Sequence, residues 1–270
     1  MAISPDLFVQ MSELIISKLS AGHYSVRLAT SEEEVLAAQH LRYEVLYKES
    51  GGTVTQAMLN SEREEDEWDA VAYHVIVLDT RDEDRVVGTI RLVAADKLKP
   101  NQAFYTEHAF DVDALRAKYP RALELSRACV SPTGRGGAIL MLLWKFTMQF
   151  IEQNQYDVLF GCASFKGQVV EEHADILSYL AEHHLASEAL MPKPKASVNA
   201  VAIEGIKTAP QAQSAGKVPA LLKGYLKIGA RITDHAVIDP VFNTTFVVIY
   251  VIARDMFRSG HHLVEKAVAH

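Results

Sequence analysis

The segment Glu124-Leu-Ser-Arg127-Ala-Cys-Val130, followed by Ser131-Pro-Thr-Gly-Arg-Gly-Gly137-Ala138-Ile139, sets the architecture of this chain. Its first part predicts a β-strand that carries two charged residues. Its second part predicts a glycine-containing turn that leads into an apolar helix. Backbone N–H groups in such a turn, together with the positive end of a helix dipole, bind phosphate. The segment therefore predicts chemistry beside a phosphate-bearing substrate.

The two charged residues of the predicted strand have an unusual spacing. Glu124 and Arg127 are three residues apart, which places them on opposite faces of a regular strand. For both to serve one site, the strand must bulge or end between them, and bulges are common beside active sites. A glutamate here could act as a general base, or it could bind a substrate cation or an arginine, and the sequence leaves both roles open.

Strand and helix signals alternate around this segment and predict an α/β fold with a mixed central sheet flanked by helices. A capping box at Ser31–Glu34 opens a helix to about Tyr47, and a polar loop follows over 49–69. Residues 73–79 and 86–95 predict a hairpin. Further helices are expected at 111–119, 138–151, 168–183 and 221–228, and further strands at 23–29, 156–163, 231–238 and 244–253.

The expected domain organisation is simple. An amphipathic helix lies within residues 1–22 and either packs on the main body or lies on a membrane surface. One domain spans 23–255 and carries a basic, proline-containing loop at 191–219, and a helix or tail occupies 256–270.

The composition excludes several classes of protein. Apolar residues make up 49% of the 270 residues, which is enough for a full core. The net charge of −7 argues against general nucleic-acid binding. The two cysteines are read as buried thiols, and no cluster with metal-ligand spacing is evident. No signal peptide is visible, and the longest apolar run, 246–253, is too short to cross a bilayer. A soluble, cytoplasmic protein is expected.

Further charged residues lie on elements that also carry core residues. They are Arg42, Asp66, Asp69 and Arg91. Together with Glu124 and Arg127 they supply three arginines and three carboxylates. Each would be costly to bury alone, so we expect them to pair. Such a network could be purely structural, or it could bind a zwitterion such as an amino acid.

The order of these residues is similar to the pattern of acyl-homoserine-lactone (autoinducer) synthases, which are relatives of the Gcn5-related (GNAT) acyltransferases. Other motifs resemble a sister group, the bacterial L-ornithine Nα-acyltransferases of ornithine-lipid synthesis. These motifs are Phe160-Gly-Cys-Ala-Ser-Phe165, Val218-Pro-Ala-Leu-Leu-Lys-Gly-Tyr-Leu226 and Asp239-Pro-Val-Phe-Asn243-Thr244. The resemblance covers about residues 25–255 and implies a GNAT-like fold.

The resemblance implies transfer of a fatty acyl group, often 3-hydroxylated, from acyl carrier protein to the α-amine of L-ornithine, giving lyso-ornithine lipid. No resident cofactor is expected, because the phosphopantetheine arm of the carrier is the donor. The donor-binding residues would be Cys129, Val130, Arg135, Gly136, Gly137, Ala138 and Ile139. The turn holds Arg-Gly-Gly-Ala rather than the full Gln/Arg-x-x-Gly-x-Gly/Ala of coenzyme A users, which favours a carrier protein as donor.

The same resemblance assigns roles to the charged residues. Glu124 and Arg127 are the candidate catalytic pair, with Glu124 as base or cation ligand. Arg91 or Arg127 would bind the ornithine carboxylate, and Asp66 and Asp69 are available for its side-chain ammonium; Arg42 completes the substrate-binding set. The alternatives are a different amine acceptor (glycine, lysine or tyrosine), S-adenosylmethionine as in autoinducer synthesis, or a non-catalytic acyl-carrier-binding module.

A basic run in this acidic chain predicts a docking face for the acidic carrier protein. The candidate docking residues are Lys193, Lys195, Lys217, Lys223 and Lys227. The anionic inner face of the bacterial inner membrane, where the lipid product must end, is the alternative partner. A solvated loop is the third interpretation.

Overall fold

The computed structural model describes residues 19–135, 137–206 and 214–258. They fall into two compact units. The first unit contains the described residues up to Gln102 together with Glu124–Gln155, and the second contains Ala103–Leu123 and the described residues from Tyr156 onward. The assignment of 23–255 to one domain stays a prediction.

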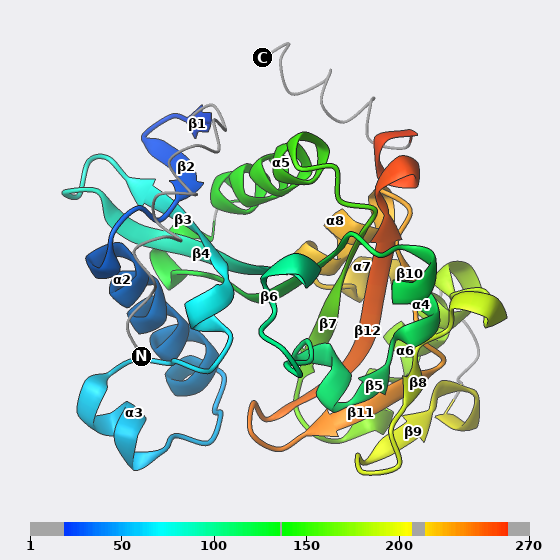
Figure 1. Cartoon of the computed structure of the whole chain (residues 1–270). Helices are drawn as coiled ribbons and strands as arrows, with labels where there is room; N and C mark the ends of the chain where they lie inside the picture. Colours follow the sequence, from blue (N-terminus) through cyan, green and yellow to red (C-terminus); the bar gives the residue numbers. More distant parts are fainter. Residues whose placement is uncertain (1–18, 136, 207–213, 259–270) are drawn as a thin grey trace. The chain divides into compact units, whose positions relative to one another are not determined.

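The strands of the first unit follow the order β1-β2-β3-β4-β6 (Figure 1). Their bounds are Leu19–Ala21, Tyr24–Leu28, Tyr73–Asp79, Arg85–Ala94 and Ala122–Val130, and β6 belongs to this unit from Glu124 onward. Strands β1 to β4 pair antiparallel with their neighbours, and the predicted hairpin is β3–β4. Strand β1 occupies the end of the predicted N-terminal helix, whose first 18 residues lie outside the described part of the chain.

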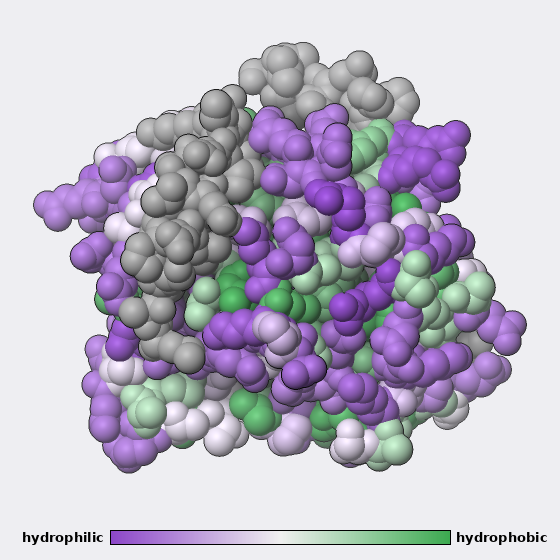
Figure 2. Space-filling view, viewed as in Figure 1, coloured by the Kyte–Doolittle hydropathy of each residue, from purple (hydrophilic) through white to green (hydrophobic). Residues whose placement is uncertain are grey.

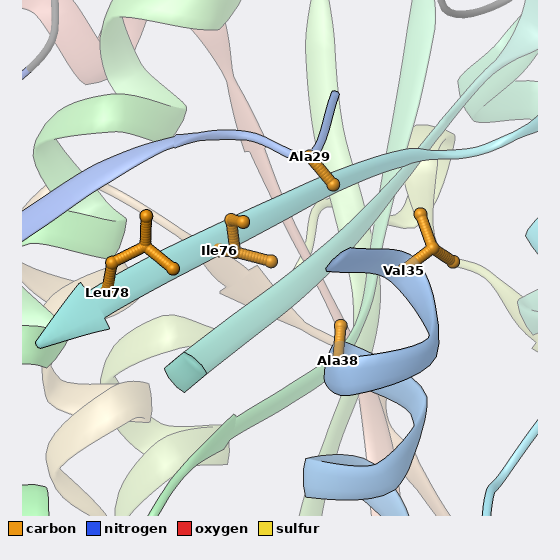
Figure 3. Packing of buried hydrophobic residues seen from close by; sticks show 5 residues of the cluster. All are labelled: Ala29, Val35, Ala38, Ile76 and Leu78. Carbon is orange, nitrogen blue, oxygen red and sulfur yellow. The ribbon is translucent and has the colours of Figure 1, made fainter. Parts of the chain in front are cut away.

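One face of this sheet packs on helix α2 (Glu32–Arg42), which begins at the Ser31 cap as predicted. Figure 3 shows Val35 and Ala38 of α2 directed toward Ile76 of β3, with Leu78 and Ala29 in the same buried cluster. Alternation along β3 then places His74 on this face as well, beside its cross-strand partner Arg91.

The other face of the sheet packs on helix α5 (Ala138–Gln153). Phe150 makes an edge contact with Tyr73, at a ring-centroid distance of 5.0 Å. Ile139 packs so closely on Gly88 that a Cβ there would lie 2.5 Å from its Cγ2. Gly88 is therefore needed so that the start of α5 can seat against β4.

Two features of the first unit differ from expectation. The helix predicted to reach Tyr47 changes after Arg42 into a π-helix, η1 (Tyr43–Glu49). The loop predicted over 49–69 contains a short helix, α3 (Gln56–Ser61), capped by Thr55. Short 3₁₀ segments complete the unit: η2 (Asp69–Val71), η3 (Ala95–Lys97) and η5 (Pro132–Gly134).

The second unit contains a sheet of order β7-β12-β11-β9, with β10 beside β12. The strands are β7 (Val158–Lys166), β9 (Ala200–Ala202), β10 (Arg231–Ile232), β11 (His235–Asp239) and β12 (Thr244–Ile252). A small sheet pairs β5 (Phe110–Asp111) with β8 (Lys193–Pro194). The helices are α4 (Asp113–Lys118), α6 (Ala174–His184), α7 (Ser214–Lys217) and α8 (Ala220–Lys227), with η4 (Thr106–His108), η6 (Val170–His173), η7 (Glu188–Leu190) and η8 (Ile203–Ile206).

Several expectations for this part of the chain are resolved by these elements. The loop predicted at 191–219 carries β8, β9, η8 and α7, so its described residues are more regular than the proline content indicated. Residues 253–258 are helical, and the rest of the predicted C-terminal segment is outside the described residues. Hydrophilic residues dominate the face seen in Figure 2. Within the described ranges, no helix combines the length and apolarity needed to cross a membrane.

Candidate active site

The last residue of α2 is a buried arginine that binds two acids. The guanidinium of Arg42 donates to both carboxylate oxygens of Asp69, at 2.8 and 2.7 Å. Its Nε lies 2.5 Å from Oε2 of Glu64, and Nη2 also donates to the Glu64 carbonyl at 2.6 Å. Arg42 thus fixes the loop that contains both acids against the end of α2.

Arg91 of β4 occupies a second position on the same face of the sheet. Its Nη1 bonds Asp66 and also Asp69, the latter at 3.0 Å. Its Nε donates to the Ser126 hydroxyl of β6 at 3.1 Å. The guanidinium carbon lies 5.9 Å from the centre of the Trp68 ring, within cation–π range. Arg91 therefore joins two strands to the acidic loop.

Arg127 is the third arginine, and its backbone is irregular. Its φ of 54° is left-handed, within a strand that otherwise runs from Ala122 to Val130. This is the departure from regular alternation that the Glu124–Arg127 spacing required. The side chain donates through Nε to Glu64 at 2.9 Å and through Nη2 to Asp66 at 2.9 Å.

These contacts close a ring in which acids and arginines alternate. We call it the charge ring; its members, in order, are Glu64, Arg42, Asp69, Arg91, Asp66 and Arg127. Every arginine contacts two carboxylates, and every carboxylate contacts two arginines. The formal charges cancel, which offsets the cost of burying them. The structure thus brings together the predicted substrate-binding residues and Arg127.

Electrostatics keep the buried acids of the charge ring ionised. Burial alone would raise the pKa of Glu64, but the nearby Arg127 and Arg42 outweigh it and hold that pKa below its usual value. Burial opposes ionisation of Asp69 in the same way, yet Arg42 and Arg91 hold its pKa far below the ordinary range. Both carboxylates are therefore anions at neutral pH.

Glu124 lies in the same strand as Ser126 and Arg127. Its side chain is fully buried. Residues two apart on a regular strand share a face, so Glu124 lies on the face of β6 from which Ser126 meets Arg91. Since the left-handed residue follows at Arg127, both members of the predicted catalytic pair lie on the charge-ring side of the sheet.

Three residues of this cluster were missed by sequence reasoning. Glu64 stands among other acids in Glu62-Arg-Glu-Glu-Asp-Glu67, and nothing in that run distinguishes it. Gln39 donates to Asp69 at 3.1 Å, but a glutamine in a helix carries no signal of its own. Ser126 was overlooked although it lies between the two charged residues of the strand. Because side chains alternate along a strand, Ser126 faces the same side as Glu124.

His74 supports the charge ring from β3. Its Nε2 lies 3.1 Å from the Asp69 carbonyl oxygen, and the side chain is almost completely buried. Burial lowers the pKa of His74 to about 4, although the Asp69 carboxylate opposes that effect. His74 is thus a neutral imidazole that donates a hydrogen bond to the backbone of the acidic loop.

The lowered pKa of His74 leads to a stability prediction. Between pH 6.5 and 4 the unfolded chain binds a proton at this histidine that the folded protein excludes, so the free energy of unfolding falls as the pH is lowered. The contribution is at most about 3 kcal/mol. Urea unfolding at pH 7 and pH 4.5 should show a smaller pH dependence in His74→Gln than in the unsubstituted protein. An equal dependence would contradict the assignment.

The predicted donor turn follows β6 directly. Gly134 N–H donates to the Ser131 carbonyl at 2.9 Å, and Gly137 takes a left-handed φ of 89° with open space where a Cβ would lie. Helix α5 starts at Ala138, whose N–H, like that of Ile139, has no acceptor within the helix. Gly136 lies outside the described residues.

The other residues that were predicted to bind the acyl donor differ in their burial and in their contacts. The side chain of Ile139 is core, so only its backbone could serve a ligand. Arg135 is half exposed and holds Glu49 with two bonds of 2.7 and 2.6 Å. Cys129 is buried, and burial raises the pKa of its thiol to about 12, which makes it a poor nucleophile. Val130 ends the strand beside a groove of about 780 Å³ that is lined by Leu41, Lys48, Glu49, Val86, Ser131 and Pro132.

Some lysines of the basic run in the second unit are paired with acidic residues that are distant in the sequence. Lys193 lies 3.8 Å from Asp234, and Lys217 bonds Asp175 at 2.9 Å. Lys223 donates to the Gly216 carbonyl at 2.8 Å. Lys195 and Lys227 are exposed side chains. Within the described chain, no group of three or more metal-ligating side chains is present.

The chain is similar in sequence to known proteins. Residues 41–145 match the family model described as Acetyltransferase (GNAT) domain. The L-ornithine N(alpha)-acyltransferase of Rhodobacter capsulatus is 35% identical over 232 residues, which cover 84% of this chain and 88% of the relative. The protein of the same name from Agrobacterium fabrum is 35% identical over 238 residues, which cover 84% of this chain and 80% of the relative.

Solved structures give weaker similarities. FeeM, an N-acyl amino acid synthase from uncultured soil microbes, has a TM-score of 0.43 and 10% identity, and the match covers 87% of this chain and 95% of FeeM. The AHL synthase LasI has a TM-score of 0.41 and 14% identity, with 86% and 91% covered.

Proposed function

Because the chain belongs to the family of L-ornithine Nα-acyltransferases, we propose that it moves a fatty acyl group from acyl carrier protein to the α-amine of L-ornithine. Membership of the family makes the chain an acyltransferase, and it confirms the family and the GNAT-like α/β fold class predicted from the sequence. The observation that carries the proposed chemistry is the charge ring with Glu124 on the same side of the sheet.

Glu124 is the proposed general base. The α-amine of an amino acid is largely protonated at neutral pH and must lose a proton before it attacks. A carboxylate on the charge-ring face can accept that proton, directly or through a water. The amine nitrogen then bonds to the thioester carbonyl carbon, the C–S bond breaks, and the thiolate leaves on the pantetheine arm and takes up a proton.

The end of β6 and the turn before α5 would bind the acyl donor. A strand N–H near Cys129 and Val130 would stabilise the negative charge that develops on the thioester oxygen. The pantetheine phosphate would bind the N–H groups of Gly137, Ala138 and Ile139, and the positive end of α5 favours an anion there. Arg135 would add a cation once it exchanges Glu49 for the phosphate.

The charge ring divides the predicted substrate-binding residues into two groups. Arg42 and Asp69 are buried and saturated by their ring partners, so we assign them a positioning role. Arg91 is buried too and already binds Asp66, Asp69 and Ser126. Its Nη2, however, makes no hydrogen bond within the described residues, whereas Arg127 already donates through Nε to Glu64 and through Nη2 to Asp66. The ornithine carboxylate would therefore bind Arg91 through Nη2.

Lys195, Lys223 and Lys227 remain the proposed contacts for the acidic carrier protein, in the cytoplasm or at the inner face of the inner membrane. Lys193 and Lys217 are weaker candidates, since Asp234 and Asp175 already neutralise them. Attraction between exposed charges is screened by salt, so this docking predicts a KM for the carrier that rises with ionic strength.

One experiment tests donor and acceptor together. The protein is incubated with a 3-hydroxyacyl carrier protein or the matching coenzyme A thioester, in low and high salt, with ornithine, lysine, glycine, tyrosine or S-adenosylmethionine. Products are read by mass spectrometry. We expect N-acyl-ornithine from the carrier donor, faster in low salt. Another acylated amine as the main product would replace ornithine in the proposal, and absence of any amide would favour the binding-module alternative.

A further inference from the structure

The six side chains of the charge ring are not equally buried. The side chains of Arg42 and Arg91 are 1% exposed, and those of Glu64 and Asp69 are 3% and 7% exposed. Asp66 is 17% exposed and its partner Arg127 is 8% exposed. Asp66 is therefore the most exposed member of the charge ring, and it is the carboxylate that a ligand can contact.

Asp66 also has an acceptor position left over. A carboxylate offers about four lone-pair positions. In Asp69, five hydrogen bonds arrive from Arg42, Arg91, Gln39 and the Asp66 N–H. In Asp66, Oδ1 accepts from Arg91 and from the Trp68 N–H, whereas Oδ2 accepts one hydrogen bond, from Arg127. A positively charged N–H group can thus be added at Oδ2 without breaking the ring.

The position of Asp66 suits the far end of a diamino acid. Arg91 links Asp66 to Ser126, and Glu124 lies two residues before Ser126 on the same face of the strand. Asp66 and Glu124 are therefore on the same side of the sheet, with Arg91 and Ser126 between them. A diamino acid carries an amine at each end and can contact two acids placed in this way. Its α-amine would then meet Glu124 while its distal ammonium meets Asp66.

Given the acyl transfer proposed above, we propose that Asp66 binds the distal ammonium of the acceptor and thereby selects L-ornithine over amino acids with uncharged side chains. Asp69, the other acid available from the sequence, holds the ring together and does not touch substrate. The acceptor class is an α,ω-diamino acid with three methylene groups.

The test compares L-ornithine with L-norvaline, which has the same carbon chain without the distal amine. In Asp66→Asn, kcat/KM for ornithine should fall about 10- to 100-fold, since a hydrogen bond to a charged group is lost. Any loss through the ring is shared by both substrates, so the value for norvaline should fall less and the ratio of the two values should fall by that factor. Glu67→Gln, which changes the exposed neighbouring acid, should leave the ratio of the two substrates unaltered.

Other outcomes have distinct meanings. Equal loss for both amino acids in Asp66→Asn would overturn the role of Asp66 and assign it to the stability of the ring. If the unsubstituted protein acylates neither amino acid, the proposed function itself fails.

A second variant keeps the charge in case Asp66→Asn does not fold. Asp66→Glu extends the carboxylate by one methylene group, so the preferred acceptor should shift from ornithine to the shorter L-2,4-diaminobutyrate. An unchanged preference for ornithine in this variant would contradict direct binding of the ammonium.

Discussion

Glu124→Gln lowers kcat for acyl transfer about 10²- to 10⁴-fold, because glutamine cannot accept the proton that the α-amine must lose. The change is isosteric at a fully buried position, so the fold should be kept. The measurement is the rate of thiol release from acyl carrier protein at saturating ornithine and pH 7.

The matched control for this prediction is Glu152→Gln. Glu152 is an exposed acid on α5, and its substitution should leave the rate unchanged. A Glu124→Gln protein that acylates at the native rate would exclude Glu124 as the base. A raised KM for ornithine with unchanged kcat would instead support the alternative role of Glu124 as a ligand for a substrate cation.

Asp69→Ala should destabilise the protein by about 3–5 kcal/mol, the usual cost of removing one partner from a buried ion pair. The loss leaves Arg42 and Arg91 with one carboxylate partner each inside the first unit, and it removes the acceptor for Gln39. Equilibrium unfolding in urea at pH 7 measures the change. Enzymatic activity should fall with it, since the ring positions Arg91 and Asp66.

A surface ion pair provides the comparison for Asp69. Glu49→Ala removes the partner of Arg135, and both side chains are more than 40% exposed. Exposed pairs contribute about 0–1 kcal/mol, so this variant should unfold close to the unsubstituted protein. If Asp69→Ala and Glu49→Ala lowered the free energy of unfolding by similar amounts, the ion pairs of the charge ring would contribute no more to stability than an exposed pair.

Sequence reasoning worked best where the deciding interactions are local. The Ser31 cap, the β3–β4 hairpin and the turn before α5 all follow from residues a few positions apart. The need for an irregularity between Glu124 and Arg127 also follows from the two-residue period of a strand. The left-handed φ of Arg127 supplies it.

The features that sequence reasoning missed depend on contacts distant along the chain. Glu64 becomes distinct from its acidic neighbours only when Arg42 and Arg127 converge on it. Asp234 and Asp175 reach the lysines of the basic run only after folding. The π-helix after Arg42 has no local signal that we can identify in Tyr43–Glu49.

The most direct test of the central claim is to locate the acyl group on the product. The full-length protein is incubated with 3-hydroxyacyl carrier protein and L-ornithine, and the product is fragmented in a mass spectrometer. The charge-ring site predicts one amide on the α-nitrogen, with the distal amine left free. An amide on the distal nitrogen, or thioester hydrolysis without any amide, would contradict the account.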